Sequence, residues 1–271
     1  MASADAAWRR WFGWALALLL AYATLLGALW LWQEKLLFHP RTLPAEHRFN
    51  AGADVHEVFI DVPGARLNAL HLRLSDPDGV VFYLHGNAGH LQSWFVNTDL
   101  YRRANLDLFM LDYRGFGKSS ARIESEAQLH ADVRAAWVHI AAKYEGRHRV
   151  FVGRSLGTGL AATLAVEVQP ELTLLISPYQ SIASLGGEIY PWVPGALLRY
   201  PLRTDLVLPG IEGPVLLLHG DRDTTIPVEH SRRLLAAVPT ARLAVIEGAG
   251  HNDLQAFDAY RQALAEALTQ R

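Results

Sequence analysis

The chain of 271 residues contains no cysteine. That absence excludes disulfide bonds, cysteine zinc sites, iron–sulfur clusters and a thiolate nucleophile. Charge is also scarce: charged residues make up 19% of the chain, and the formal net charge is −2. Because nucleic-acid binding normally needs a basic face, we expect no nucleic-acid partner. Apolar residues make up 51%, which excludes a disordered chain, and this length is sufficient for one globular core.

Apolar residues are concentrated near the N-terminus. The stretch 11–32, WFGWALALLLAYATLLGALWLW, has no charged side chain, and two tryptophans stand at each of its ends. As a helix it would be about 33 Å long, which is enough to cross the hydrocarbon core of a bilayer. Tryptophan at both ends is typical of interfacial belts. The sequence therefore predicts an N-terminal flank, 1–10, a transmembrane anchor, 11–32, and a polar connector, 33–54.

Two alternatives to the anchor exist. A cleaved signal peptide could use Ala21–Ala23 as its A-x-A site, but the apolar run continues beyond Ala23, longer than such a peptide needs. A buried core helix would show a polar face, and none interrupts the run. The positive charges on the two sides of the stretch nearly balance: Arg9 and Arg10 precede it, and Lys35, Arg41 and Arg48 follow it. We expect the following domain on the non-cytoplasmic side, because long domains translocate largely regardless of charge.

Residues 55–271 alternate short β-branched runs with helical patterns, which predicts a mainly parallel eight-stranded sheet with helices on both faces, the α/β class. Pro63–Gly64 should turn an antiparallel hairpin between the first two strands. The proline-rich segment 178–210 should be a small cap of loop and short helix. The expected strands are Val55–Val62, Leu67–Leu74, Val80–Leu84, Leu106–Leu111, Arg149–Val152, Leu172–Ser177, Val215–His219 and Leu243–Glu247; the expected helices are Leu91–Arg103, Glu124–Tyr144, Leu156–Gln169, Val228–Val238 and Asp253–Arg271.

The pentapeptide Gly153–Gly157, with the sequence GRSLG, lies between an expected strand and an expected helix. G-x-S-x-G in that context is the nucleophile elbow, a tight turn that exposes its serine at the end of the sheet. Glycines flank the serine because side chains there would collide with neighbouring backbone. The alternative is an ordinary glycine-rich turn. We therefore take Ser155 as the candidate nucleophile.

A serine nucleophile needs a base, and the base needs an acid to orient it. In elbow enzymes the chain order is serine, acid, histidine. Asp223 follows the seventh expected strand and His251 follows the eighth, in a glycine-flanked loop. Both therefore lie at the sheet edge that carries Ser155. His56, His71, His139 and His148 have no such placement and are expected to be surface or core histidines.

Acyl transfer also needs hydrogen-bond donors for the oxyanion. The third expected strand ends in HGNAGH, the position of the loop that donates one N–H in hydrolases. We expect the backbone N–H groups of Asn87 and Leu156 to form the oxyanion hole, with His85 bracing the loop. Asp112 and Arg114 are expected to form a structural ion pair. No metal motif or dinucleotide fingerprint occurs, so we expect no metal and no cofactor.

Taken together, the chain resembles the α/β hydrolases, specifically the membrane-anchored α/β-hydrolase-domain serine hydrolases that include the bud-emergence (Bem) family. The resemblance covers nearly the whole chain. It implies a Ser155–Asp223–His251 triad, a small cap and no cofactor, but no particular substrate. It rests on the anchor followed by QEKLLFHP and on the motifs FYLHGNAGH, LDYRGFGKS, GRSLGTG, YPWVP, LLLHGDRDTTIP and GAGHND.

The expected activity is hydrolysis of acyl esters or thioesters through an acyl-enzyme, on a small-molecule or lipid-like acyl substrate near a membrane. Aromatic and aliphatic residues in 178–210 could line an acyl groove, or they could only pack the cap onto the core. A serine aminopeptidase-like peptidase is one alternative, with Glu188 as the candidate ligand for a substrate amine. A non-catalytic binding protein on the same fold is the other.

Overall fold

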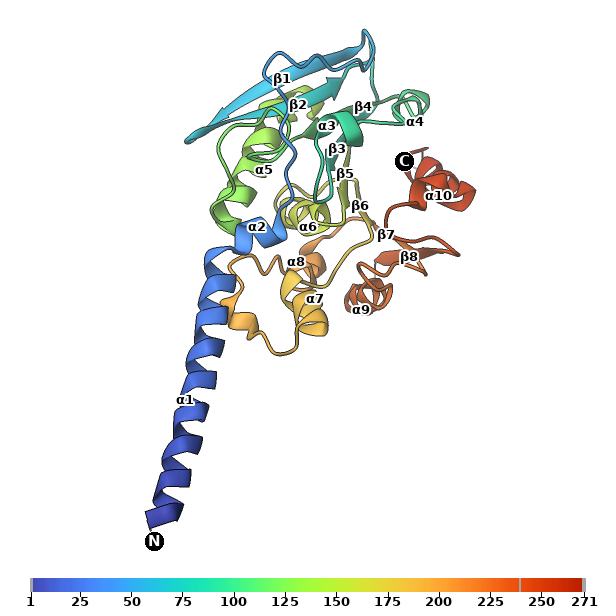
Figure 1. Cartoon of the computed structure of the whole chain (residues 1–271). Helices are drawn as coiled ribbons and strands as arrows, with labels where there is room; N and C mark the ends of the chain where they lie inside the picture. The colour runs from blue at the N-terminus through green and yellow to red at the C-terminus, as the bar shows by residue number, and fades with distance from the viewer. Residues whose placement is uncertain (1, 239, 270–271) are drawn as a thin grey trace.

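The computed structural model describes residues 2–238 and 240–269 (Figure 1). Its centre is an eight-stranded sheet with the order β1-β2-β4-β3-β5-β6-β7-β8. β2 pairs antiparallel with both β1 and β4, and the remaining neighbours pair parallel. The predicted mainly parallel sheet is confirmed. Its strands are β1 (Val55–Val62), β2 (Ala65–Leu72), β3 (Gly79–Leu84), β4 (Leu106–Leu111), β5 (His148–Arg154), β6 (Leu172–Ile176), β7 (Val215–Gly220) and β8 (Ala241–Ile246).

The central strands are buried on both faces, which explains their continuous apolar sequences. Every residue of β3 and β4 is buried. Strands of a parallel sheet are covered by helices on each side, so they show no alternation of polar and apolar residues. β1 and β2 meet at the edge of the sheet, where Val62 pairs with Ala65 across the predicted Pro63–Gly64 turn.

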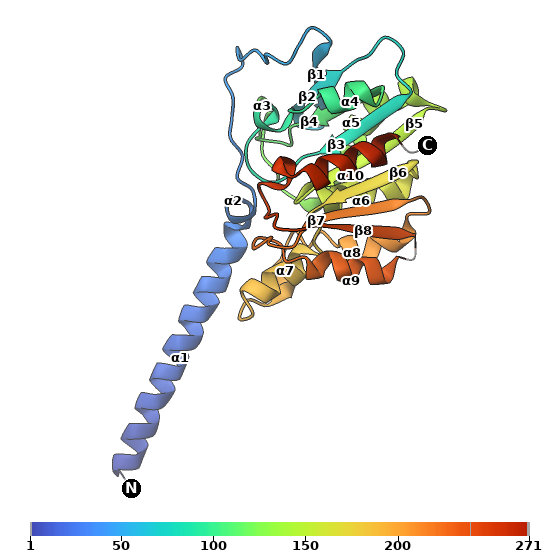
Figure 2. The same cartoon turned by 90° about the vertical axis from the view of Figure 1, so that its right-hand side faces the viewer.

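Helices cover both faces of the sheet. On one face α3, α4 and α10 pack against apolar side chains such as Tyr83 and Val152. On the other, α5 and α6 pack against side chains such as Phe82 and Phe151. Figure 2 shows α10 lying across the face turned toward the viewer. The bounds are α3 (Leu91–Trp94), α4 (Asp99–Arg103), α5 (Glu126–Ala141), η1 (Ala142–Tyr144), α6 (Gly157–Val168), α9 (Glu229–Ala237), η4 (Leu254–Ala256) and α10 (Asp258–Thr269).

Two helix predictions need correction. The helix expected over Leu91–Arg103 is two short helices, because Asn97 adopts a φ of 55° that a right-handed helix cannot continue through. The C-terminal helix begins at Asp258 and not at Asp253, because η4 occupies the intervening residues. Its last two predicted positions, 270 and 271, lie outside the described residues.

The segment 178–210, called here the cap, runs between β6 and β7. It contains two α-helices, α7 (Ile182–Ile189) and α8 (Thr204–Val207), and two short 3₁₀ turns, η2 (Gly195–Leu197) and η3 (Leu208–Gly210). Ser181 caps α7 by accepting the backbone N–H of Ser184, and the buried side chains of Tyr179 and Tyr200 fix the cap to the core.

A single long helix, α1 (Ala2–Leu31), projects from the domain in both views (Figures 1 and 2). Its apolar part, Trp8–Leu31, has a mean hydropathy of 2.0, and none of its most apolar stretch is buried. It is therefore not a core helix. The predicted polar connector packs against the domain where it begins: it starts with α2 (Gln33–Leu37), and both Gln33 and Phe38 are buried.

Candidate active site

Ser155 occupies the turn between β5 and α6 with a φ of 50°, in the left-handed region that residues other than glycine rarely adopt. The flanking glycines make this turn possible. A Cβ on Gly153 would lie 2.5 Å from the carbonyl oxygen of Gly157, and one on Gly157 would lie 2.0 Å from the carbonyl oxygen of Leu84. The predicted strand–turn–helix context of Ser155 is therefore present.

The structure brings the three predicted side chains together. His251 Nε2 lies 3.0 Å from Ser155 Oγ, and His251 Nδ1 lies 2.7 Å from Asp223 Oδ2. His251 follows β8 and Asp223 follows β7, so both reach the carboxyl edge of the parallel sheet where β5 delivers Ser155. A nucleophile, a base and an orienting acid are thus within hydrogen-bonding distance in that order.

Asp223 is buried and fully engaged. Its Oδ1 accepts the backbone N–H groups of Thr225 and Ile226, while Oδ2 contacts His251 and lies 3.4 Å from His219 Nε2. Burial by itself raises the pKa of the Asp223 carboxyl. Hydrogen bonds from His219, His251 and the Ile226 N–H outweigh burial and hold that pKa well below its usual value. The carboxylate is therefore ionised over the whole physiological pH range.

The neighbouring Asp221 has a different role. Its Oδ1 accepts the backbone N–H of Gly248 at 2.7 Å, so it ties the loop after β7 to the loop after β8. Asp221 and Asp223 are two residues apart, but only Asp223 faces His251. Asp223, the acid predicted from the sequence, is therefore the one of the two that contacts the candidate base.

The loop after β3, residues 85–90, is called here the β3 loop, and it lies against Ser155. A Cβ on Gly86 would be 3.3 Å from Ser155 Cβ. The side chain of the next residue, Asn87, is held by the connector: it donates to the carbonyl of Leu37 and accepts the N–H groups of His39 and Ala88. Asn87 and Leu156, the two predicted backbone donors, therefore lie on segments that adjoin Ser155.

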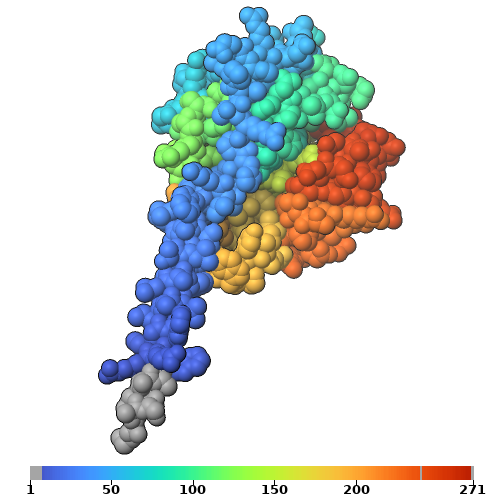
Figure 3. All heavy atoms as spheres, in the orientation of Figure 1, coloured from blue at the N-terminus to red at the C-terminus, as the bar shows by residue number. Residues whose placement is uncertain are grey.

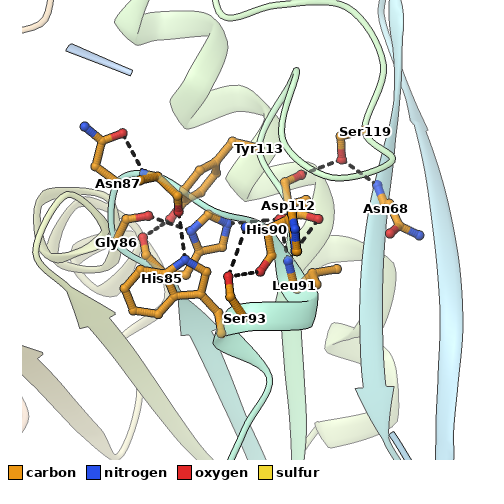
Figure 4. A network of polar contacts seen from close by, with 12 residues as sticks. Asn68, His85, Gly86, Asn87, His90, Leu91, Ser93, Asp112, Tyr113 and Ser119 are labelled. Carbon is orange, nitrogen blue, oxygen red and sulfur yellow. Dashed lines mark hydrogen bonds and ion pairs between the residues drawn. The ribbon is translucent and has the colours of Figure 1, made fainter. Parts of the chain in front are cut away.

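Buried groups beneath the β3 loop hold it in place (Figure 4). Tyr113 donates its hydroxyl hydrogen to the carbonyl of His85 at 2.8 Å. The His85 ring stacks on Trp94, and its Nε2 lies 3.4 Å from Asp112 Oδ1. Asp112 also accepts the N–H of Leu91, at the start of α3. His85 thus braces the loop, as expected, and does not point to Ser155.

The expected ion pair between Asp112 and Arg114 does not form. Arg114 makes a bidentate pair with Asp132 of α5, with its Nε 2.6 Å from Asp132 Oδ2. Asp112 instead faces His85 and the N–H of Leu91. The chain leaves β4 after Leu111 and turns at Arg114 and Gly115, where Gly115 has a φ of 78°, so the two side chains reach different partners although they are only two residues apart.

Sequence reasoning missed Arg154, the variable residue of the elbow just before Ser155. Its side chain is 8% exposed, and its Nη2 donates to the carbonyl of His251 at 3.1 Å. Its Nη1 donates to Gln255, and the guanidinium lies 5.4 Å from the centre of the Trp94 ring. Arg154 thus links the histidine loop to the helix that follows the β3 loop. Nothing in the sequence marks it, because x positions of G-x-S-x-G are variable by definition.

Two further contacts also depend on the fold. Tyr179, at the start of the cap, donates its hydroxyl hydrogen to the carbonyl of Leu156 at 2.9 Å. His219, at the end of β7, contacts Ser231 at 2.6 Å and the carbonyl of Ile226 at 2.8 Å. The first fixes the start of α6 beside Ser155, and the second supports the loop that carries Asp223.

A surface hollow of about 940 Å³ lies beside this site. It is bordered by Asn87, Trp94 and Arg154 on one side and by α10 residues such as Tyr260 on the other. Ser155, His251 and the cap do not line it. Among the described residues, no cluster of three or more histidine, aspartate or glutamate side chains is arranged to hold a metal ion.

Comparison with known proteins places the chain in a family. A family model described as "Serine aminopeptidase, S33" matches residues 75–203. An uncharacterized protein of Mycobacterium tuberculosis (strain H37Rv) is 32% identical over 241 residues, covering 85% of this chain and 84% of that protein. Alpha/beta hydrolase domain-containing protein 17B of Xenopus tropicalis is 31% identical over 215 residues, covering 76% and 72%. The chain belongs to the α/β-hydrolase superfamily.

Solved structures of α/β hydrolases have the same fold as this chain. An esterase of Pyrococcus furiosus aligns with a TM-score of 0.68 and 18% identity, covering 86% of this chain and 97% of the esterase. Est1E of Butyrivibrio proteoclasticus, solved with ferulic acid bound, aligns with a TM-score of 0.63 and 20% identity, covering 78% and 96%. This superfamily member therefore has a hydrolase-type architecture, and its function as a hydrolase of the serine type follows from family and fold together.

Proposed function

We propose that this α/β hydrolase cleaves acyl esters or thioesters, with Ser155 as nucleophile, His251 as general base and acid, and Asp223 as the orienting carboxylate. The observation that carries the proposal is the continuous relay from Ser155 Oγ through His251 to Asp223, with heavy-atom distances of 3.0 and 2.7 Å. It is supported by the strained elbow, which presents the serine hydroxyl to a ligand and not to the core.

In the acylation step, His251 Nε2 takes the hydroxyl proton while Ser155 Oγ bonds to the acyl carbon. The backbone N–H groups of Asn87 and Leu156 stabilise the negative oxygen of the tetrahedral intermediate. The bond to the leaving oxygen or sulfur then breaks, and His251 returns its proton to that atom. Asp223 stays ionised throughout and stabilises the imidazolium, as the low pKa of its carboxyl requires.

Deacylation repeats these roles with water. His251 removes a proton from water, the hydroxide oxygen bonds to the acyl carbon, and the bond to Ser155 Oγ breaks. Ser155 regains its proton and a free acid leaves.

A peptidase is the main alternative, and the description of the matching family model favours it. Such an enzyme must bind the terminal amine of its substrate, and Glu188 is the candidate carboxylate. Glu188 is already paired: its Oε1 lies 2.7 Å from Arg233 Nη1 and its Oε2 lies 3.3 Å from His230 Nε2. Because the Arg233 guanidinium already neutralises Glu188, we favour the ester or thioester substrate. A non-catalytic binding protein would not need the relay at all.

We further propose that α1 anchors the enzyme in a membrane, with the catalytic domain on the non-cytoplasmic side. The apolar part of α1 is long enough to cross a bilayer and lies wholly outside the core. A chain with this helix exposed to water would leave a large apolar surface unburied, and a bilayer covers it. Such an anchor favours a lipid-like acyl substrate, since the active site then stays close to the bilayer surface.

A fluorophosphonate probe tests the catalytic assignment. Full-length protein should be labelled at Ser155, the Ser155→Ala variant should not be labelled, and Ser120→Ala, a change at an exposed serine, should retain labelling. Acyl esters and thioesters of increasing chain length and aminoacyl amides are then compared by kcat/KM. Labelling that persists in Ser155→Ala contradicts the nucleophile, and a clear preference for the amides supports the peptidase.

A further inference from the structure

Part of the cap is apolar, uncharged and exposed. The ten residues Ile189–Leu198, called here the cap tip, include no charged side chain. Ile189, Tyr190 and Trp192 are 53%, 54% and 47% exposed. Contiguous exposed apolar residues of this kind mark a surface that another apolar phase or partner covers.

The cap tip lies alongside α1, the proposed membrane anchor (Figures 1 and 3). The hydroxyl of Tyr22 donates to the backbone carbonyl of Trp192 at 2.7 Å. Tyr22 precedes Trp30 by eight residues, or about 12 Å along a helix. Half of a hydrocarbon core is about 15 Å. The cap tip therefore reaches the depth of one leaflet and does not reach the bilayer centre.

A set of polar contacts marks where the membrane surface crosses the structure. Arg199, the first charged residue after the cap tip, pairs with Glu34 at 2.6 Å. Its guanidinium also lies 5.2 Å from the centre of the Trp30 ring. Tryptophan and arginine together at the end of an apolar helix are typical of the interface between lipid and water. Arg199, Glu34 and Trp30 thus mark the end of the cap tip that lies nearest the connector.

The backbone of the cap tip is suited to a medium without water. Pro191 and Pro194 have no N–H to satisfy. The carbonyl of Trp192 accepts from Tyr22, and that of Leu197 accepts from the side chain of Gln33 at 3.0 Å. Residues 190, 193, 197 and 198 donate their N–H groups within local turns. In lipid such internal pairing is required, whereas at a water-exposed loop it is not.

Basic residues surround the level at which lipid headgroups would lie. A hollow of about 750 Å³ at the end of α1 is lined by Lys35, Arg41, Arg122 and Arg199, with only Glu34 and Glu124 as acidic residues. Phospholipid surfaces attract such cations. Along the axis of α1, the apolar cap tip is therefore followed by Trp30 and then by the basic residues that line this hollow.

We propose that the cap tip inserts into the same leaflet as the C-terminal half of α1, so that the occupant of this surface is the lipid bilayer and acyl chains reach Ser155 from the membrane side. Two hydrogen bonds connect the cap and the connector to segments beside Ser155. Tyr179 joins the start of the cap to Leu156, and Leu37 joins the end of α2 to Asn87. The proposal rests on the proposed function, in that it requires the anchor.

Because the chain has no cysteine, single-cysteine variants report depth without background. Trp192→Cys and, as a second tip position, Tyr190→Cys are labelled with a nitrobenzoxadiazole dye in phosphatidylcholine vesicles whose acyl chains carry nitroxide quenchers. Leu18→Cys, 70% exposed on α1, is the control for the anchor. Glu145→Cys is the control for a position in water, because Glu145 is exposed in the loop before β5, at the end of that strand opposite to Ser155.

We expect the dye at either tip position to lose emission to the same extent as at Leu18, while the dye at Glu145 keeps its emission. Quenching at Leu18 without quenching at both tip positions overturns the insertion and leaves the anchor standing. Emission shifted to the blue at the tip without quenching shows that a second copy covers it, which also overturns the proposal. Absence of quenching at Leu18 rejects the anchor and the insertion together.

Activity provides a second, independent test. Trp192→Asp should lower kcat/KM for a long-chain ester embedded in vesicles at least tenfold, while turnover of a water-soluble short-chain ester is unchanged. Val138→Asp, the same charge added at an exposed valine of α5, is the matched control and should affect neither substrate. Equal losses on both substrates would overturn the proposal, and inactivity of the unmodified chain on both esters would instead reject the proposed function.

Discussion

The side chain of Asn87 donates a hydrogen bond to the backbone carbonyl of Leu37, so the β3 loop is fastened to the segment that follows α1. The same side chain accepts the N–H of His39. A backbone donor must be held in place before the reaction to stabilise an oxyanion well. The connector is therefore part of the support for the catalytic geometry, although it lies about 50 residues from the β3 loop in sequence.

Replacing the Asn87 side chain should weaken that support. We expect Asn87→Ala to lower kcat about tenfold with little change in KM, because about 1–3 kcal/mol is typical for a buried hydrogen bond left unpaired. Steady-state kinetics on a soluble ester measure kcat and KM separately. Asn50→Ala, at an exposed position of the connector, is the control and should be neutral. A rise in KM alone would show that Asn87 contacts substrate and does not position the loop.

The two aspartates after β7 should differ sharply. Asp223→Asn should lower kcat by roughly 10⁴, by analogy with the acid of the serine protease triad. Asp221→Asn keeps an oxygen that can accept the N–H of Gly248 and should have a small effect. Kinetics and fluorophosphonate labelling rates measure both. If Asp221→Asn were the severe change, Asp223 would not be the orienting acid.

Arg154 should act as a positioning residue for His251. Arg154→Met keeps an apolar stem against Trp94 but removes the donor to the His251 carbonyl, so we expect kcat to fall about tenfold for roughly 1.4 kcal/mol of lost positioning. The pH profile of kcat should also shift, since the His251 ring is less firmly held, and a merely structural role would leave that profile unchanged. Arg242→Met, at an exposed position of β8, is the control.

The anchor should be retained in the mature protein. Full-length protein should resist carbonate extraction, and Leu20→Arg should cost about 3 kcal/mol of insertion. A chain that begins at Gln33 should be soluble and active, because it keeps the contacts of Gln33, Phe38 and Leu37. A chain that begins at Arg41 loses them and should be less active. A mature N-terminus found near Thr24 would disprove the anchor.

Acid should destabilise the fold through Asp107, a buried carboxylate of β4. Burial raises its pKa, but hydrogen bonds from His71, the N–H of Leu74, Lys143 and Tyr144 outweigh burial and lower it. A lowered pKa in the folded state stabilises the fold above the unfolded-state value of about 3.9, and that stabilisation is lost as the pH falls through the lower folded value.

Asp107→Asn should therefore reduce the free energy of unfolding by about 1–3 kcal/mol at pH 7 and flatten its decline below pH 4. Urea denaturation in detergent micelles at pH 7 and pH 3 measures both effects. Asp61→Asn, whose carboxylate is 90% exposed, should leave the pH dependence as it is. An equally steep decline in Asp107→Asn would assign the acid sensitivity to another carboxylate.

Local sequence alone was sufficient for the sheet and for the order of the three catalytic candidates. β3 and β4 are buried on both faces, so they appear in the sequence as apolar runs without alternation, which only Asp107 interrupts in β4. Gly153, Ser155 and Gly157 identify the elbow because its steric demands apply within five residues. The loops after β7 and β8 lie at the edge that carries Ser155, since parallel strands end on the same side.

Only the tertiary structure decided which side chains support those residues. Arg114 pairs with Asp132 and not with Asp112, and Arg154 reaches the His251 carbonyl 97 residues away. The contacts of Tyr22 with Trp192 and of Leu37 with Asn87 join segments that no local pattern relates. Hydrogen bonds of this kind depend on where two distant backbones meet and on which rotamer each side chain adopts. The hydrophobic periodicity of a sequence indicates which residues are buried. It does not indicate which side chains of distant segments form hydrogen bonds with each other.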